Sequence, residues 1–272
     1  MTALKSKIGY DRDSEEFRTN TRRLAQFAEA IGDTNPAHLE GRIASPVFHH
    51  VPVMQSMVEV LNKVASGFIM HGEHDFHFHA PIVPGQRLFS VSTLTGIRSS
   101  PAGALYLIRS DTRTHDGKDI CTQYATCLIQ KRKVAQNLGK KNPEKPEPAR
   151  TGNPETVTYP IAGDLTLKYA DAARDYSPYT IDPAVAKSLG LPAPIVHGMC
   201  TLALISRAIV DGACKGDTRR LKRLGCRFSH PLYLRPGQDL VASLWAGKKA
   251  VAFEATDAEG NVVVKNGFAE VA

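Results

Sequence analysis

The residues best suited to chemistry lie in one short stretch, Gly32 to His38. Within six residues it places the carboxylate of Asp33, the amide of Asn35 and the imidazole of His38. Gly32 and Pro36 keep this stretch from forming a regular helix, since glycine adopts left-handed angles and proline lacks an N–H. A carboxylate beside an imidazole can share proton transfers, and positioned acid–base groups contribute roughly 10²–10⁴-fold in rate. A plain turn is the competing interpretation, because these are also common turn residues.

A second, altered copy of the pattern lies at 173–180. It keeps the carboxylate as Asp175, but Ser177 stands in place of the asparagine and Thr180 in place of the histidine. We therefore expect acid–base chemistry in the first copy only. In the second copy we expect Asp175 to be a turn residue, with Tyr179 and Thr180 lining an inert pocket or packing locally.

Longer segments also repeat, and they predict two units of similar fold. Segment 76–88 has a counterpart at 226–240, and each predicts a strand, a Pro-Gly-Gln turn and a second strand. Apolar residues at helical spacing predict one helix ahead of each hairpin, at 53–68 and 199–209. Further strands are predicted after each hairpin, at 88–97, 104–113 and 120–130 and at 240–245, 250–256 and 262–269.

These elements predict an α+β double hotdog, in which each repeat is a central helix wrapped by a long curved antiparallel sheet. One such sheet would leave an edge strand bare, whereas two side by side can pair their edges into one sheet. We assign the N-terminal repeat to 1–136 and the C-terminal repeat to 155–272. The segment 137–154 between them is rich in Lys, Pro, Asn and Glu and predicts an exposed connection.

The composition excludes several classes of protein. The chain has 272 residues, a formal net charge of +7 and 42% hydrophobic residues. It contains neither an apolar run that could span a bilayer nor an N-terminal secretory signal, so we expect a cytoplasmic protein without membrane contact. The five cysteines form no Cys-x-x-Cys pair, which argues against disulfides and zinc. The basic clusters lack interleaved aromatic residues, which argues against nucleic acid as a partner.

The chain resembles the MaoC-like, or hydratase 2, family of (R)-specific enoyl-CoA hydratases and dehydratases. Residues 32–38 match the family motif Gly-Asp-x-Asn-Pro-x-His at every fixed position. Residues 71–81 are similar to the first repeat of fatty-acid-synthase-type (FAS1-type) dehydratases, and 194–199 to the typical second repeat. Two departures stand out. The intact motif lies in the first repeat, and His49-His50 stands where His-Gly is usual.

The resemblance implies a hydro-lyase that adds water reversibly to a 2-enoyl thioester of coenzyme A or a carrier protein. Its product would be the (R)-3-hydroxyacyl thioester, and no cofactor would be needed. Asp33 and His38 would hold the water and share the two proton transfers, and Asn35 would orient them. The oxyanion donor would be a backbone N–H near His49 or His50, because helix N-termini present free N–H groups. A homodimer is a further expectation from the family.

Other residues are candidates for substrate binding. His71 and His74 are candidates for lining the acyl pocket and favouring a carboxylated chain, the alternative being ordinary strand-end and loop histidines. Seven of the ten histidines fall between 38 and 79, but no acidic or thiol partner has a recognised ligand spacing, so no metal is expected. Four basic residues are candidates for the coenzyme A phosphates, with surface solvation as the alternative: Arg219, Arg220, Lys222 and Arg223.

Three alternatives stay open at this point. An acyl-CoA thioesterase is one, because the hotdog fold hosts both activities. A hydratase for carboxylated or branched enoyl-CoA is the second. A non-catalytic acyl-CoA-binding subunit is the third, and it would bind ligand without turnover.

Overall fold

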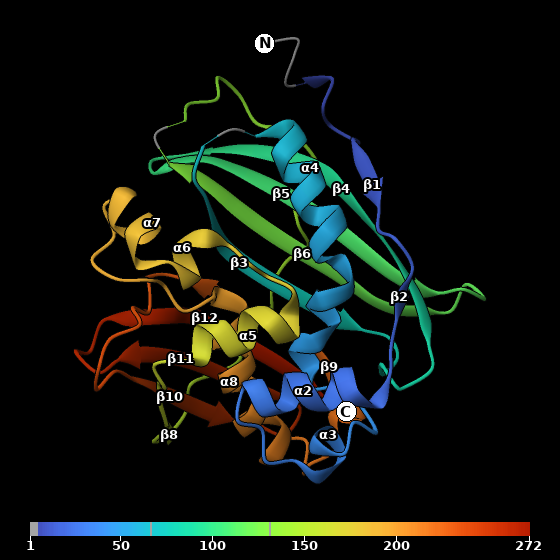
Figure 1. Cartoon of the computed structure of the whole chain (residues 1–272), viewed down its shortest axis with the longest axis vertical. Helices are drawn as coiled ribbons and strands as arrows, with labels where there is room; N and C mark the ends of the chain where they lie inside the picture. Colours follow the sequence, from blue (N-terminus) through green and yellow to red (C-terminus); the bar gives the residue numbers. More distant parts are fainter. Residues whose placement is uncertain (1–4, 66, 131) are drawn as a thin grey trace.

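The computed structural model describes residues 5–65, 67–130 and 132–272. One antiparallel sheet runs through both repeats (Figure 1). Its central strands are β3 (Ile69–Phe78) and β9 (Leu221–Phe228), which pair with Asp75 opposite Gly225. Next to β3 follow β6 (Asp119–Gln130), β5 (Gly103–Thr114) and β4 (Arg87–Ser100), and next to β9 follow β12 (Val262–Val271), β11 (Ala250–Asp257) and β10 (Asp239–Ala246).

The strand order is the same on either side of the β3–β9 pair, so the two repeats are related by a pseudo-twofold axis at that junction. Short strands complete the edges. β1 (Asp11–Asp13), β2 (Phe17–Arg18) and β7 (Leu138–Gly139) pair with β4, and β8 (Glu155–Pro160) pairs with β10. The edge-to-edge pairing predicted for a double hotdog is therefore present.

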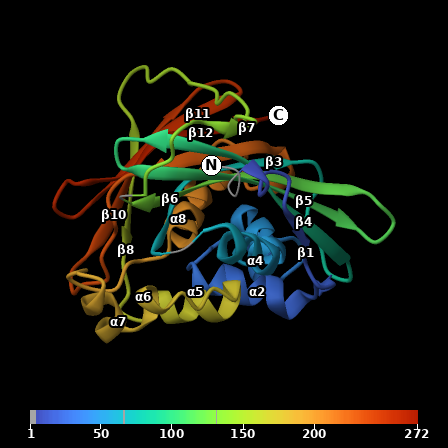
Figure 2. The same cartoon turned by 90° about the horizontal axis from the view of Figure 1, so that it is seen from above.

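The main helices cover one face of the sheet (Figure 2). The central ones are α4 (Met54–Val64), preceded by the 3-10 helix η1 (Pro46–Val53), and α8 (Gly198–Asp211). Apolar residues all around α8 make it a buried core helix, whereas α4 is amphipathic. The remaining helices are α2 (Thr21–Ala30), α3 (Pro36–Leu39), α5 (Leu165–Ala173), α6 (Pro178–Ile181), α7 (Pro183–Ser188) and the 3-10 helix η2 (Thr218–Arg220). Within the described parts of the chain, every helix is too short or too polar to cross a bilayer.

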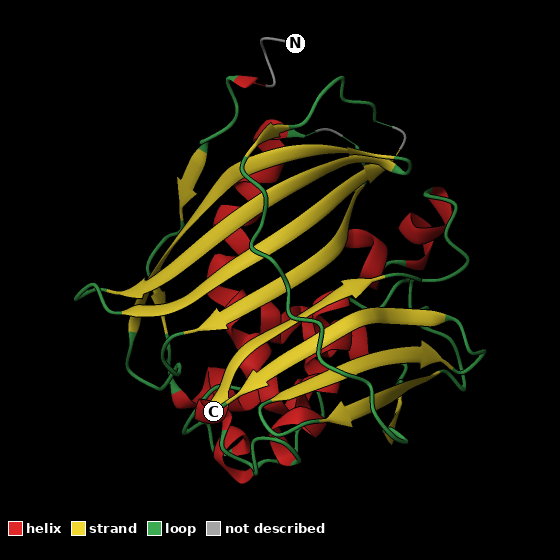
Figure 3. Cartoon of the chain, turned by 180° about the vertical axis from the view of Figure 1, so that it is seen from behind, coloured by secondary structure: helices red, strands yellow, loops and turns green. Residues whose placement is uncertain are grey.

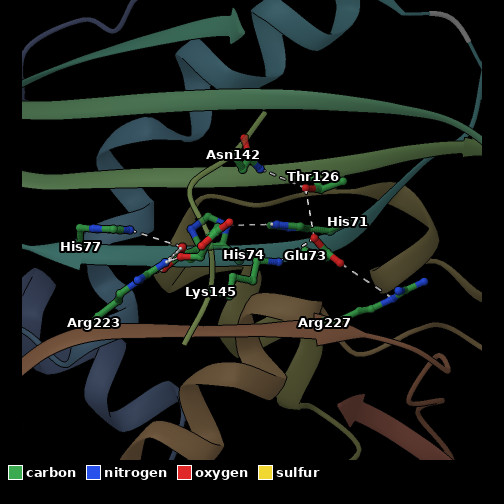
Figure 4. Close-up of polar contacts among 11 residues, drawn as sticks. His71, Glu73, His74, His77, Thr126, Asn142, Lys145, Arg223 and Arg227 are labelled. Carbon is green, nitrogen blue, oxygen red and sulfur yellow. Dashed lines mark hydrogen bonds and ion pairs between the residues drawn. The ribbon is translucent and has the colours of Figure 1, made fainter. Parts of the chain in front are cut away.

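The connection between the repeats crosses the opposite face of the sheet (Figure 3). Lys145 lies 2.6 Å from Glu73 of β3, and the backbone carbonyl of Glu144 accepts a 2.8 Å hydrogen bond from Arg223 of β9. Asn142 donates to the hydroxyl of Thr126, as Figure 4 also shows. The connection is thus held against the β3–β9 junction by side chains from both repeats. The boundaries assigned at 136 and 155 stay predictions.

An ion pair at the same junction buries a charge. The Arg223 guanidinium binds both carboxylate oxygens of Asp75, at 3.0 and 2.8 Å, and His77 approaches the same carboxylate (Figure 4). The side chain of Asp75 is 1% exposed and that of Arg223 is 12% exposed. Such a pair is costly to break from one side, because the remaining charge stays buried without its partner.

We therefore predict that Arg223→Leu lowers the free energy of unfolding by about 3 kcal/mol in urea denaturation. The double variant Asp75→Leu/Arg223→Leu removes both charges, so its free energy of unfolding should fall by less than that of Arg223→Leu. Arg113→Leu breaks an exposed pair with Asp119 and serves as the control, with a small loss expected. Equal losses for the two arginine variants would contradict the prediction.

Candidate active site

The first-repeat motif forms a tight turn between two helices. After α2, Gly32 adopts a left-handed φ of 60°, and the N–H of Asp33 bonds back to the carbonyl of Ala28 at 2.8 Å. Asn35 then caps α3, since its side-chain oxygen accepts a 2.9 Å hydrogen bond from the N–H of Ala37. The turn interpretation is therefore right for the backbone. The same turn also places His38, on α3, against Asp33.

Asp33 and His38 form a buried hydrogen-bonded pair. Asp33 Oδ2 lies 2.7 Å from His38 Nδ1 and accepts a 2.9 Å bond from the Ser45 hydroxyl, and Oδ1 accepts from the N–H of Asn35 at 3.0 Å. Burial disfavours the charged carboxylate, but these bonds, and the positive charge that His38 carries when it is protonated, outweigh it, so the pKa of Asp33 lies below its usual value. An ionised carboxylate only accepts hydrogen bonds, which places the proton of neutral His38 on Nδ1.

The second repeat completes this cluster. The hydroxyl of Thr218, the first residue of η2, lies 2.5 Å from His38 Nε2. The amide of Asn35 donates to the carbonyl of Gly216 at 2.8 Å. The expected role of Asn35 was to orient Asp33 and His38 through its side-chain amide. Instead, its backbone N–H contacts Asp33, and its side chain ties the motif to the second repeat.

A pocket of about 130 Å³ adjoins the cluster. Thr218 both lines this pocket and bonds His38, whereas His38 itself is 1% exposed and does not line it. The threonine hydroxyl thus stands between the imidazole and the pocket. The other lining residues come from η1, from the end of β3 and the loop after it, and from the η2–β9 segment: Pro46, His49, Phe78, His79, Ala80, Pro81, Arg219, Leu221 and Lys222.

The structure divides the four predicted phosphate-binding residues. Arg219 and Lys222 line the pocket beside Thr218. Arg220 instead bonds the carbonyl of Ala272, and Arg223 holds Asp75 in the sheet junction. Arg220 and Arg223 do not line the pocket, because their guanidinium groups are engaged by these other partners.

The expected helix start at His49 and His50 is replaced by the 3-10 helix η1, and α4 begins only at Met54. Inside a 3-10 helix the N–H groups bond carbonyls three residues earlier, so neither position is a free helix N-terminus. Pro52 lies within η1 and has no N–H, so no α-helical bond from position 52 back to Phe48 can form. His49 is buried with Nδ1 2.8 Å from the carbonyl of Pro46, and burial lowers its pKa to about 4.

A larger cavity, of about 490 Å³, lies at the second, altered motif. Asp175, Tyr179, Thr180 and the start of α8 line it, together with α4 of the first repeat. His71 lines this cavity and not the pocket beside Thr218. His74 is buried behind it, 3.0 Å from His71 and 3.1 Å from Gln123. In the described ranges, no group of three or more His, Cys, Asp or Glu is arranged to hold a metal ion.

In comparisons with known proteins, each half of the chain matches a dehydratase family model. Residues 6–123 match the FAS1-like dehydratase domain region, and residues 144–267 match the MaoC-like domain. The first half of the chain therefore carries a FAS1-like dehydratase region and the second half a MaoC-like domain. Peroxisomal enoyl-CoA hydratase 2 of Arabidopsis thaliana is 24% identical over 241 residues, which cover 83% of this chain and 77% of that protein. Enoyl-CoA hydratase ChsH3 of Mycobacterium tuberculosis is 29% identical over 201 residues, covering 73% and 68%.

Solved structures of similar fold support the architecture described above. A MaoC-like dehydratase from Phytophthora capsici superimposes with a TM-score of 0.87 at 23% identity, covering 98% of this chain and 97% of that one. A Mycobacterium tuberculosis protein described as a double hotdog fold gives a TM-score of 0.64 at 11% identity, covering 97% and 95%. The predicted α+β double-hotdog fold is therefore confirmed.

Ionisation of Asp33 should make stability depend on pH. The pKa of Asp33 is lower in the folded state than the unfolded value of about 3.9. The ionised carboxylate therefore adds to the free energy of unfolding above about pH 4, and this stabilisation is lost as the pH falls through the folded pKa. Asp33→Asn lacks this contribution, so its unfolding free energy should fall less steeply below about pH 4 than that of the parent. Urea denaturation at several pH values measures this. Asp119→Asn, at an exposed ion pair, is the control, and parallel curves for Asp33→Asn and parent would refute the assignment.

Proposed function

We propose that this MaoC-like protein is a hydro-lyase that adds water reversibly to a short 2-enoyl-CoA or carrier-bound thioester. The product is the (R)-3-hydroxyacyl thioester, as the resemblance to hydratase 2 implies. The observation that carries the proposal is the buried Asp33–His38 pair, which a second-repeat hydroxyl links to a pocket. The names of the relatives, enoyl-CoA hydratase 2 and enoyl-CoA hydratase ChsH3, support the same reaction class.

The proposed chemistry uses His38 Nε2 as the basic nitrogen. Asp33 accepts the Nδ1 proton and stabilises the imidazolium that forms, as an orienting carboxylate does in other acid–base sites. Because Thr218 separates His38 from the pocket, its hydroxyl takes a proton from water as it gives its own to Nε2. The water oxygen bonds to C3, the double-bond electrons move to C2, and the imidazolium returns a proton to C2 by the same route.

The dimensions and charge of the pocket indicate the substrate. Its volume of about 130 Å³ is below the roughly 300 Å³ at which drug-sized ligand pockets begin, which favours a short acyl group such as crotonyl. Arg219 and Lys222 at its wall supply positive charge for the coenzyme A phosphates. No cofactor takes part in this reaction. A homodimer and a cytoplasmic location remain predictions.

One observation favours a second candidate, an acyl-CoA thioesterase. The order carboxylate, imidazole, hydroxyl in Asp33, His38 and Thr218 is that of acyl-transfer triads, in which the hydroxyl attacks the carbonyl carbon. In that case Thr218 would become acylated and coenzyme A would leave as a free thiol. Release of thiol from crotonyl-CoA, with no hydrated product, would favour this candidate over the hydratase.

The hydration of crotonyl-CoA tests the assignment of the pair. We expect Asp33→Asn and His38→Ala to lower kcat by roughly 10²–10⁴-fold. Asp175→Asn makes the same change in the altered motif, and its kcat should fall far less. Wild-type turnover in either first-repeat variant would sink the proposal. Binding of crotonyl-CoA by the parent without any turnover would indicate a non-catalytic subunit.

The Thr218 relay makes a separate prediction. Thr218→Val keeps the side-chain volume but removes the hydroxyl, so kcat should fall by about 10²-fold, the lower end for a proton-transfer group. Thr218→Ser keeps a hydroxyl and should recover most of the rate and the pH profile of the parent. If the residue only fills space, the serine variant should be worse than the valine variant.

A further inference from the structure

The larger of the two pockets described above has no part in the chemistry proposed above. It measures about 490 Å³, within the range of small-molecule sites, and lies between the two central helices of the repeats. Met54, Met57, Val58 and Leu61 of α4 form one apolar wall, and Phe68 and Phe228 continue it. An apolar chamber of this size between helices is suited to a hydrocarbon chain.

The start of α8 forms the polar end of the cavity. Gly198 and Met199 line it, and no side chain caps this helix. The first N–H groups of a helix have no intrahelical partner and carry the positive end of the dipole, so they suit a ligand oxygen. Gly198 also allows a close approach, since a Cβ there would lie 3.3 Å from the Phe228 ring.

Two buried histidines line this cavity, and one of them, His197, has an unpaired nitrogen. His197 is 4% exposed, its Nε2 bonds the carbonyl of Asp175 at 3.0 Å, and its Nδ1 has no partner among the described residues. His50 is 3% exposed, and its Nδ1 must donate to Gln123, because the Oε1 that it contacts only accepts. An unpaired buried polar atom is costly, and a bound ligand that pairs with it would relieve that cost.

The charges around the cavity select against an anionic ligand. Asp175 contributes a carboxylate to the lining. Burial lowers the pKa of His50 and lowers that of His71 to about 3, so both imidazoles stay neutral near pH 7. A free fatty acid would therefore bring its carboxylate against Asp175 without a cation to balance it. A thioester carbonyl is neutral and still accepts hydrogen bonds from the helix N-terminus.

We propose that this cavity is a second acyl-thioester site, which holds a medium-length acyl chain along α4 with its carbonyl oxygen at the N-terminus of α8. The ligand is not hydrated there, because Thr180 occupies the motif position of the catalytic histidine. The cavity is separate from the Asp33–His38 site. One lies at the start of α8, and the other contacts Gly216 and Thr218 just beyond its end, about 20 Å away for a helix of 14 residues.

Octanoyl-pantetheine is the probe, because it carries the thioester without the phosphates that would engage Arg219 and Lys222. Isothermal titration of the full-length protein should show saturable binding. Val58→Trp fills the cavity from α4 and should weaken binding at least tenfold. Glu59→Trp, on the next residue of the same helix but outside the lining, should bind as the parent does. Leu61→Phe is a second cavity-filling variant in case Val58→Trp does not fold.

Octanoate is the alternative ligand, since it carries the same acyl chain with a carboxylate in place of the thioester. It should bind at least tenfold more weakly than octanoyl-pantetheine. Asp175→Asn should reduce the difference in affinity between octanoate and the thioester, because it removes the charge that repels the octanoate carboxylate. If the parent, Val58→Trp and Leu61→Phe bind octanoyl-pantetheine with equal affinity, the proposed location of the site is wrong. If octanoate binds more tightly than octanoyl-pantetheine, the proposed ligand class is wrong. The hydratase proposal is tested separately, by the hydration activity of Asp33→Asn. If that proposal fails, the binding titration can still be interpreted on its own.

Discussion

Backbone pairing between β3 and β9 is the constraint on which the rest of the structure depends. It joins the two repeats at their edges, in an antiparallel register centred on Asp75 and Gly225. A Cβ at Gly225 would lie 2.5 Å from the Phe268 ring and 2.8 Å from the carbonyl of His74, so the close approach requires glycine. Because the residues that follow α8 lead directly into β9, this register also decides which second-repeat residues reach the first-repeat motif.

The same junction gives the two related sites different shapes. At the first motif, the segment after α8 packs inward, so that Gly216 bonds Asn35 and Thr218 bonds His38, and only a small pocket remains. At the second motif, the corresponding contact is a ring pair between Phe68 and Tyr179, and a large chamber stays open beside it. The intact acid–base pair and the larger volume therefore lie at different motifs, which a symmetric duplication would not produce.

Much of the fold could be predicted from the sequence, because repeated patterns of apolar residues and Pro-Gly-Gln turns set helices and strands locally. The Asp33–His38 contact was also predictable, since both residues belong to one turn. Thr218 was not, because it lies 180 positions from His38 and meets it only through the β3–β9 register. The unusual helix entry at His49 and His50 was missed although it is a local feature. The apolar spacing predicted a helix from residue 53 but did not reveal the 3-10 helix that precedes it over 46–53.

The persistence of Asp175 in the altered motif follows from its local bonds. Its Oδ1 accepts from the N–H and the hydroxyl of Ser177, as Asp33 Oδ1 accepts from the N–H of Asn35. The carboxylate therefore shapes the turn in both repeats, whether or not chemistry follows. What differs is the second oxygen, which in Asp33 binds His38 and Ser45. Retention of the aspartate alone is thus evidence for a turn, and it is the added imidazole and hydroxyls that distinguish a site for proton transfer.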